Sequence, residues 1–147
     1  MSKSPHLLIV EARFYADISD ALADGAVAWL ETAGATYDRI AVPGVFEIPA
    51  VIRFAIESDR YDGYVALGCV IRGETSHYEF ICTESARGLG KVALDYLAAI
   101  GYGILTCENR EQAVARAATD DGNKGRAAAE ACLAMVAIKR KFGIAGP

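Results

Sequence analysis

Six small or polar residues, RGETSH (72–77), follow the apolar run YVALGCVI (64–71). Ser76 and Glu79 have the spacing of a helix-capping box, which predicts a helix starting near His77. The free N–H groups of a helix start, together with its dipole, favour an anion such as phosphate. The same dipole disfavours a positive charge on His77, so a neutral ring able to accept a proton is expected there. A histidine at this place can serve as a general acid or base, or simply cap or pack.

Three more short segments follow apolar runs rich in strand-forming residues: EARFY, PGVFE and ENRE. The first two contain Phe14 and Phe46, which can pack into a core or stack on a ligand. Glu47 comes directly before an expected helix and can either cap it or bind ligand hydroxyls. Lys124 in NKG and Arg116 on a helix face are ordinarily solvated charges, so composition alone assigns them no role.

The elements that must position these residues alternate along the chain. Strands are expected at 6–12, 37–42, 64–71 and 102–107, and helices at about 17–33, 49–58, 77–99, 110–118 and 124–142. Alternating strands and helices with short connections predict a parallel sheet covered by helices on both faces. Ligands of such sheets bind beyond the carboxyl ends of the strands, where all four loops lie. Gly88 and Gly90 inside a helix would be explained by close packing on another helix.

Bulk properties limit the possible functions. The 147 residues suit one domain, with residues 1–5 as a ragged terminus, and the 53% hydrophobic content suggests subunit contacts besides a core. A net charge of −4 with interspersed signs favours neither a nucleic-acid partner nor a membrane surface, and no apolar run is long enough to cross a membrane. The four cysteines have no metal-binding spacing and are expected to be buried thiols in a reducing cytoplasm. No GxGxxG, phosphate-binding P-loop, nucleophile elbow or metal-ligand cluster occurs.

Four segments carry a resemblance that spans nearly the whole chain. In order, they are VPGVFEIPA (42–50), ALGCVIRGETSHYEF (66–80), GILTCENREQAVARA (103–117) and GNKG (122–125). In sequence, order and spacing the chain resembles the 6,7-dimethyl-8-ribityllumazine synthase family. The resemblance implies a three-layer α/β/α fold, flavodoxin-like, with a four-stranded parallel sheet.

The same resemblance implies an enzyme of riboflavin biosynthesis, a transferase that needs no cofactor and no metal. Its small-molecule substrates would be 5-amino-6-(D-ribitylamino)uracil and 3,4-dihydroxy-2-butanone 4-phosphate. The products would be the lumazine, phosphate and water. The family assembles as homopentamers with sites at subunit interfaces, and some members stack twelve pentamers into a 60-subunit shell.

Site residues follow from the resemblance position by position. His77 corresponds to the proton-transfer residue. The aminouracil would be bound by Phe14, Val45, Phe46, Glu47, Cys69, Val70 and Ile71, with Tyr102 and Lys124 coming from a neighbouring subunit. The phosphate would be bound by Glu74 (through its backbone amide), Thr75 and the neighbour's Arg116.

Three places depart from the family pattern. Tyr15 stands where Asn is common after the stacking aromatic, and Arg126-Ala127 stand where an acid often follows the NKG segment. Glu74 stands where a small residue is common. The turn ATDDGN lacks the Gly-Thr-Lys pattern of shell-forming relatives, which favours a free pentamer. Two other interpretations remain open: a non-catalytic paralogue on the same fold that binds riboflavin or lumazine or forms a shell, and a generic flavodoxin-like binder of phosphates or nucleotides.

Overall fold

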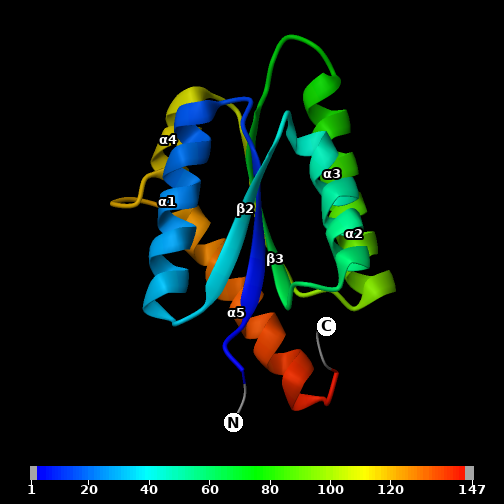
Figure 1. The fold of residues 1–147 in the computed structure, drawn as a ribbon. Coiled ribbons are helices and arrows are strands. Elements are labelled where there is room, and N and C mark those ends of the chain that lie inside the picture. The colour runs from blue at the N-terminus through cyan, green and yellow to red at the C-terminus, as the bar shows by residue number, and fades with distance from the viewer. Residues whose placement is uncertain (1–2, 145–147) are drawn as a thin grey trace.

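The alternation of strands and helices produces a four-stranded, all-parallel sheet in the order β2-β1-β3-β4. The computed structural model describes residues 3–144, shown in Figure 1. The strands are β1 (His6–Ala12), β2 (Thr36–Val42), β3 (Gly63–Ile71) and β4 (Ile100–Cys107). The helices are α1 (Ala16–Thr32), α2 (Ile48–Ser58), α3 (His77–Tyr96), α4 (Arg110–Ala117) and α5 (Lys124–Lys141), with a short 3-10 turn η1 (Val45–Glu47) before α2.

The sheet separates two hydrophobic cores, because successive residues of each strand point to opposite faces. Leu7 and Ile9 of β1 pack with α1, α4 and α5, whereas Leu8 and Val10 pack with α2 and α3. Figure 1 shows these two helical layers on either side of the sheet. The expected flavodoxin-like α/β/α architecture is therefore confirmed.

Most expected boundaries agree with the structure to within a few residues. The predicted cap of α4 is confirmed, since Asn109 Oδ1 accepts from the Gln112 N–H at 2.9 Å. Gly88 packs closely on α2, because a Cβ there would lie 3.0 Å from Pro49, but nothing lies within 4 Å of a Cβ on Gly90. The helix–helix explanation therefore holds for the first glycine only. Of the N-terminal segment expected to be ragged, residues 3–5 have no regular secondary structure and residues 1–2 lie outside the described range.

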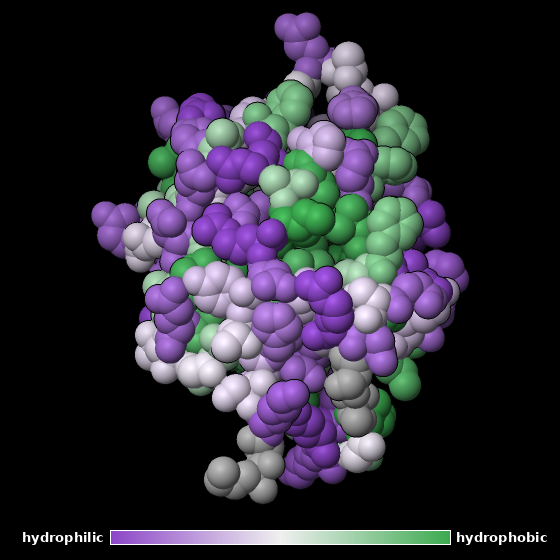
Figure 2. Space-filling view, in the orientation of Figure 1, coloured by the Kyte–Doolittle hydropathy of each residue, from purple (hydrophilic) through white to green (hydrophobic). Residues whose placement is uncertain are grey.

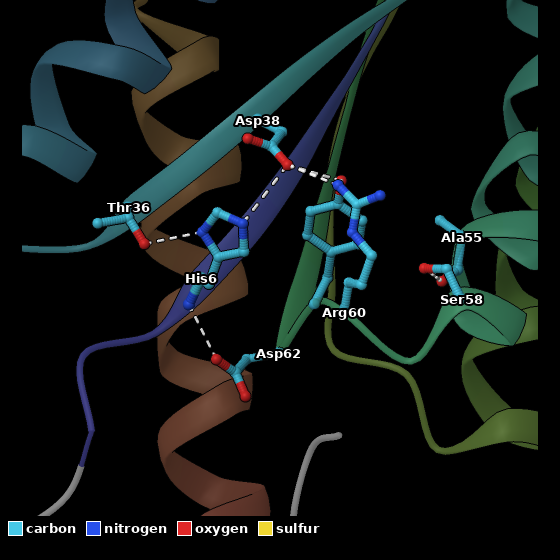
Figure 3. Close-up of polar contacts among 8 residues, drawn as sticks. His6, Thr36, Asp38, Ala55, Ser58, Arg60 and Asp62 are labelled. Carbon is cyan, nitrogen blue, oxygen red and sulfur yellow. Dashed lines mark hydrogen bonds and ion pairs between the residues drawn. The ribbon is translucent and has the colours of Figure 1, made fainter.

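The amino ends of β1, β2 and β3 carry a polar cluster (Figure 3). His6 Nδ1 lies 2.8 Å from Thr36 Oγ1, and its Nε2 lies 3.5 Å from Asp38 Oδ2. Asp38 also accepts from Arg60 at 3.1 Å. The cluster joins neighbouring strands at the sheet end opposite the four loops, so it stabilises the fold without reaching them.

Apolar side chains also lie on the surface. Figure 2 shows them gathered over β2 and α2, where a shallow groove includes the exposed Ile40 and Phe54. A surface patch of this kind is typical of a contact with another chain. Within residues 3–144, no helix is long and apolar enough to cross a membrane.

Candidate active site at the carboxyl edge of the sheet

The strand order by itself predicts where a ligand binds. From β1 the chain crosses to β2 on one side, and from β2 it crosses back to β3 on the other side of β1, so the order reverses between β1 and β3. Parallel sheets bind ligands in the crevice outside the strand ends at such a reversal. The loops after β1 and β3 flank this point, and the loop after β2 lies next to it.

A hollow of about 560 Å³ occupies this position. We call it the first hollow. Its lining comes from the loops after β1 and β2, the end of β3 and the first turns of α3: Phe14, Tyr15, Gly44, Val45, Phe46, Glu47, Cys69, Val70, Ile71, His77 and Ile81. Every residue predicted to bind the aminouracil from within one chain lines it, together with His77. The structure therefore brings this half of the predicted site together.

The two phenylalanines of the first hollow do not belong to a core. Phe14 is 75% exposed and Phe46 is 58% exposed, which excludes core packing within this chain. The Phe14 ring packs edge-on against Tyr15 with centroids 4.9 Å apart. Tyr15, a departure from the family pattern, thus supports the Phe14 ring. An aromatic face held in this way can stack on a flat heterocycle.

Glu47 is free to contact a ligand. It occupies the cap position of α2, yet its side chain makes no capping hydrogen bond. A Cβ added to Gly44 would lie only 3.2 Å from Glu47 Oε1, so the loop passes close beside the carboxylate. Hydroxyl groups of a ligand are natural donors to such an acceptor.

The end of β3 offers backbone groups rather than a nucleophile. Burial raises the pKa of the Cys69 thiol to about 12, so it stays protonated near neutral pH. Val70 and Ile71 are partly buried at the end of the strand. In the described part of the chain, no group of three His, Cys, Asp or Glu residues could hold a metal ion.

The predicted capping box before α3 is wrong, although the helix begins at His77 as expected. The Ser76 side chain makes no cap bond, and the Glu79 carboxylate binds Arg72 instead of the Ser76 backbone. Thr75 Oγ1 accepts from the His77 N–H at 3.3 Å. Glu74 and Thr75 are exposed beside the first hollow without lining it.

The remaining predicted residues lie elsewhere. Tyr102, Arg116 and Lys124 line a second hollow of about 350 Å³ between β4, α4 and α5. The two hollows have no lining residue in common. A single chain therefore does not bring the predicted phosphate ligand Arg116 to His77.

Close backbone contacts fix the position of the GNKG segment: Gly122 lies against the backbone of α4, and Gly125 lies against the backbone of α1. A Cβ on Gly122 would lie 2.8 Å from Arg116 Cα, and one on Gly125 would lie 1.9 Å from the Leu22 carbonyl oxygen. Only glycine permits these approaches. They hold Lys124 beside Arg116, so the segment is a structural junction rather than a solvated turn.

The second departure from the family pattern has a structural outcome. Arg126, in the segment where an acid is common, binds Glu130 at 2.6 Å and lies 4.7 Å from the Trp29 ring. Ala127 lines the second hollow. Neither residue supplies Lys124 with an acidic partner.

Three lining residues of the first hollow were not among the predicted ligands. Tyr15 and Gly44 adjoin predicted residues, and Ile81 lies one helical turn after His77. The i, i+4 spacing of Ile81 is a signal that could have identified it.

Fold and site together define a class of protein. It is a flavodoxin-like α/β protein whose switch-point hollow has aromatic walls, an acidic acceptor and a helix N-terminus beside a histidine. These features suit a flat ring with hydroxyl groups, next to an anion.

Comparisons with known proteins identify the family. The sequence profile of 6,7-dimethyl-8-ribityllumazine synthase matches residues 4–140. A protein of that name from Bartonella tribocorum is 59% identical over 144 residues, covering 97% of this chain and 95% of the relative. A namesake from Agrobacterium fabrum is 55% identical over 148 residues, covering 97% and 99%. One from Sphingopyxis alaskensis is 54% identical over 139 residues, covering 95% and 98%. The chain belongs to the 6,7-dimethyl-8-ribityllumazine synthase family.

Proposed function

We propose that this chain condenses 5-amino-6-(D-ribitylamino)uracil with 3,4-dihydroxy-2-butanone 4-phosphate to form 6,7-dimethyl-8-ribityllumazine in riboflavin biosynthesis. One observation carries the proposal: the residues predicted to bind the aminouracil from within one chain line the same hollow as His77, which stands at a helix start. Family membership supplies the substrates, and the hollow supplies a place for them.

The aminouracil occupies the first hollow. Its ring stacks on Phe14, and the backbone at Cys69–Ile71 faces its polar edge. Val45 and Phe46 cover the ribityl chain, whose hydroxyls donate to Glu47. The half-buried carboxylate with no capping bond supports this role for Glu47.

The butanone phosphate lies beside the start of α3. Its phosphate accepts from the backbone N–H groups of Glu74 and Thr75, where the helix dipole favours negative charge. Glu74 contributes its amide only, because its carboxylate would repel phosphate. Charge balance comes from Arg116, which forms a charge-assisted pair.

The reaction then proceeds by proton transfers. The uracil amine attacks the ketone and water leaves to form an imine. Phosphate is eliminated as a proton is lost from carbon, and the enol rearranges to a ketone. The ribitylamino nitrogen attacks this second carbonyl and closes the ring, and loss of a second water then gives the lumazine. His77 carries protons in these steps, an effect worth ~10²–10⁴-fold in rate. Holding the two reactants together contributes more, at ~7–11 kcal/mol.

The complete site lies between two subunits. Arg116, Tyr102 and Lys124 from a neighbour complete the first hollow, with Lys124 at a pyrimidine carbonyl. Their position in a separate hollow of the same chain supports this arrangement. The exposed Ile40 and Phe54 support self-association. The turn ATDDGN lacks the Gly-Thr-Lys pattern of shell-forming relatives, which favours a free homopentamer over a 60-subunit shell.

Two broader features belong to the same proposal. Residues 1–147 act as one domain, and the enzyme works in the cytoplasm. All four cysteines are free, which supports a reducing compartment.

The direct test mixes both substrates with the purified protein and follows lumazine absorbance above the uncatalysed background. Turnover that falls in His77→Ala while a residual rate persists supports the proposal. An unchanged rate at saturation would remove His77 from the mechanism. No turnover, with retained binding of flavin or lumazine, would favour the non-catalytic paralogue, and preferential nucleotide binding would favour the generic binder.

A further inference from the structure

One side chain that the proposed mechanism does not use spans the turn between β3 and α3. Arg72 is the first residue after β3, and its backbone N–H donates to the Cys107 carbonyl at 2.9 Å. Its guanidinium donates from Nη1 to the Glu79 carboxylate in the first turn of α3. It also donates from Nε to Glu108 Oε2 at 2.7 Å, and Cζ lies 4.4 Å from the Tyr78 ring centre. A single residue thus ties together the ends of β3 and β4 and the start of α3.

These contacts close a loop around residues 73–78. Arg72 lies before this segment and Glu79 after it, so their bond joins the two ends. Few other contacts support the turn: all residues from 72 to 77 are exposed, and the Ser76 side chain makes no cap bond. The segment contains the amides proposed to bind phosphate and the ring proposed to move protons. Its conformation therefore depends heavily on the arginine.

An arginine beside a phosphate-binding turn suggests a simpler role, which is direct contact with the phosphate. Its two carboxylate partners argue against that role in this conformation, because they already neutralise the guanidinium. Hydrogen bonds to Glu108 and Glu79 raise the pKa of Arg72, and the bond from Arg72 lowers the pKa of Glu79. An isolated surface ion pair contributes little, but a planar guanidinium with two acceptors and an aromatic neighbour has a defined direction.

We propose that Arg72 is a positioning residue for the reaction: its bonds to Glu79 and Glu108 hold the 73–77 turn so that the phosphate-binding amides and His77 keep their places beside the first hollow. This inference rests on the proposed function. It explains the failed capping box, since Glu79 is engaged in the bond to Arg72. It also leaves the phosphate charge to be balanced by Arg116.

The two roles for Arg72 predict opposite effects when the carboxylates are removed. If Arg72 positions the turn, then Arg72→Met removes its ion pairs, and the double change Glu79→Gln with Glu108→Gln removes the carboxylate charges that hold it, so both variants share a phenotype. If Arg72 binds phosphate directly, then the double change frees the guanidinium and improves use of the phosphate substrate. Glutamine keeps the shape of glutamate, so the double variant is a mild change.

The experiment measures kcat and the KM of each substrate separately. For both variants we expect kcat to fall by about tenfold, because small displacements of reacting groups are costly. The KM of butanone phosphate should rise, whereas that of ribitylaminouracil should stay within about twofold, because Phe14 and Glu47 lie on other loops. Arg87→Met is the matched control, since Arg87 binds Glu84 at 2.7 Å on the same helix, and its kinetics should equal those of the wild type.

Hydrogen exchange at amides 73–77 provides an independent readout. It should accelerate in Arg72→Met and in the double variant but not in Arg87→Met, while the global melting temperature stays nearly constant. Wild-type kinetics in Arg72→Met would overturn the inference, as would a lowered phosphate-substrate KM in the double variant or unchanged exchange in both. A wild-type protein without turnover would instead refute the proposed function, so the two failures can be told apart.

Discussion

Mixed oligomers of His77→Ala and Arg116→Ala chains should have an activity well above that of either variant alone. The first change damages only the first hollow and the second only the second hollow, because the two share no residue. If each site takes its first hollow from one chain and its second from a neighbour, some mixed interfaces contain neither change. A site built within one chain would always contain one of them.

The expected size of the recovery follows from counting interfaces. In a random mixture at equal proportions, a first hollow is intact in half of the chains and a second hollow in the other half, so about a quarter of the sites are intact. The background is low. Losing the proton carrier costs up to ~10²–10⁴-fold in rate. Losing a charge-assisted hydrogen bond costs ~1.5–3 kcal/mol, or roughly 10- to 100-fold in the use of the phosphate substrate.

The assay co-expresses the two variants, or refolds them together, and measures lumazine formation below the KM of the butanone phosphate. Each variant alone and a simple mixture of the two assembled proteins serve as controls. Recovery near one quarter of the wild-type rate, seen only after co-assembly, supports an intersubunit site. A co-assembled mixture whose rate merely equals the mean of the two variants would refute the reasoning.

Three further predictions concern the exposed Phe14 ring, the close approach of α1 and α5 at Gly125, and the polar cluster at the amino ends of the strands. Phe14→Ala should raise the KM of the aminouracil about three- to tenfold, because one aromatic stacking contact is lost. The melting temperature should change little because the ring is 75% exposed, and a large loss of stability would contradict this prediction. Gly125→Ala should destabilise the fold by ~1–3 kcal/mol in urea titrations, because the new Cβ would lie 1.9 Å from the Leu22 carbonyl oxygen and α1 and α5 must move apart. An unchanged free energy of unfolding would show that the two helices accommodate a Cβ at this position. A hydrogen bond from Tyr61 is the main cause of the lowered pKa of Asp38, so this contact stabilises the fold above about pH 4 and is lost as pH falls through the lowered pKa. Tyr61→Phe should therefore weaken the acid dependence of the urea midpoint, and an unchanged pH profile would disprove the coupling.

Sequence patterns were sufficient for the parts of this protein that depend on neighbours along the chain. Strand and helix periods predicted the parallel sheet and its two helical layers, and the Asn109 cap was predicted because donor and acceptor are three residues apart. The site loops could be placed at one edge because parallel strands all end on the same side. Phe14 and Glu47 were left open between structural and binding roles, since each role uses the same local pattern.

Tertiary structure decided those contacts for which a local partner and a partner from elsewhere in the fold are both possible. Ser76 and Glu79 satisfy the capping pattern, but Arg72 takes the carboxylate because its guanidinium carries a positive charge, whereas the backbone N–H at Ser76 is neutral. That arginine is held in place by Glu108, which follows β4 and is distant in sequence.

The separation of the two hollows is likewise invisible in the linear order of residues. Sequence alone determined the fold class, the family and the chemistry available at the sheet edge. Only the folded chain showed that His77 and Arg116 lie in different hollows, because the packing of α4 and α5 on β4 fixes where Arg116 lies.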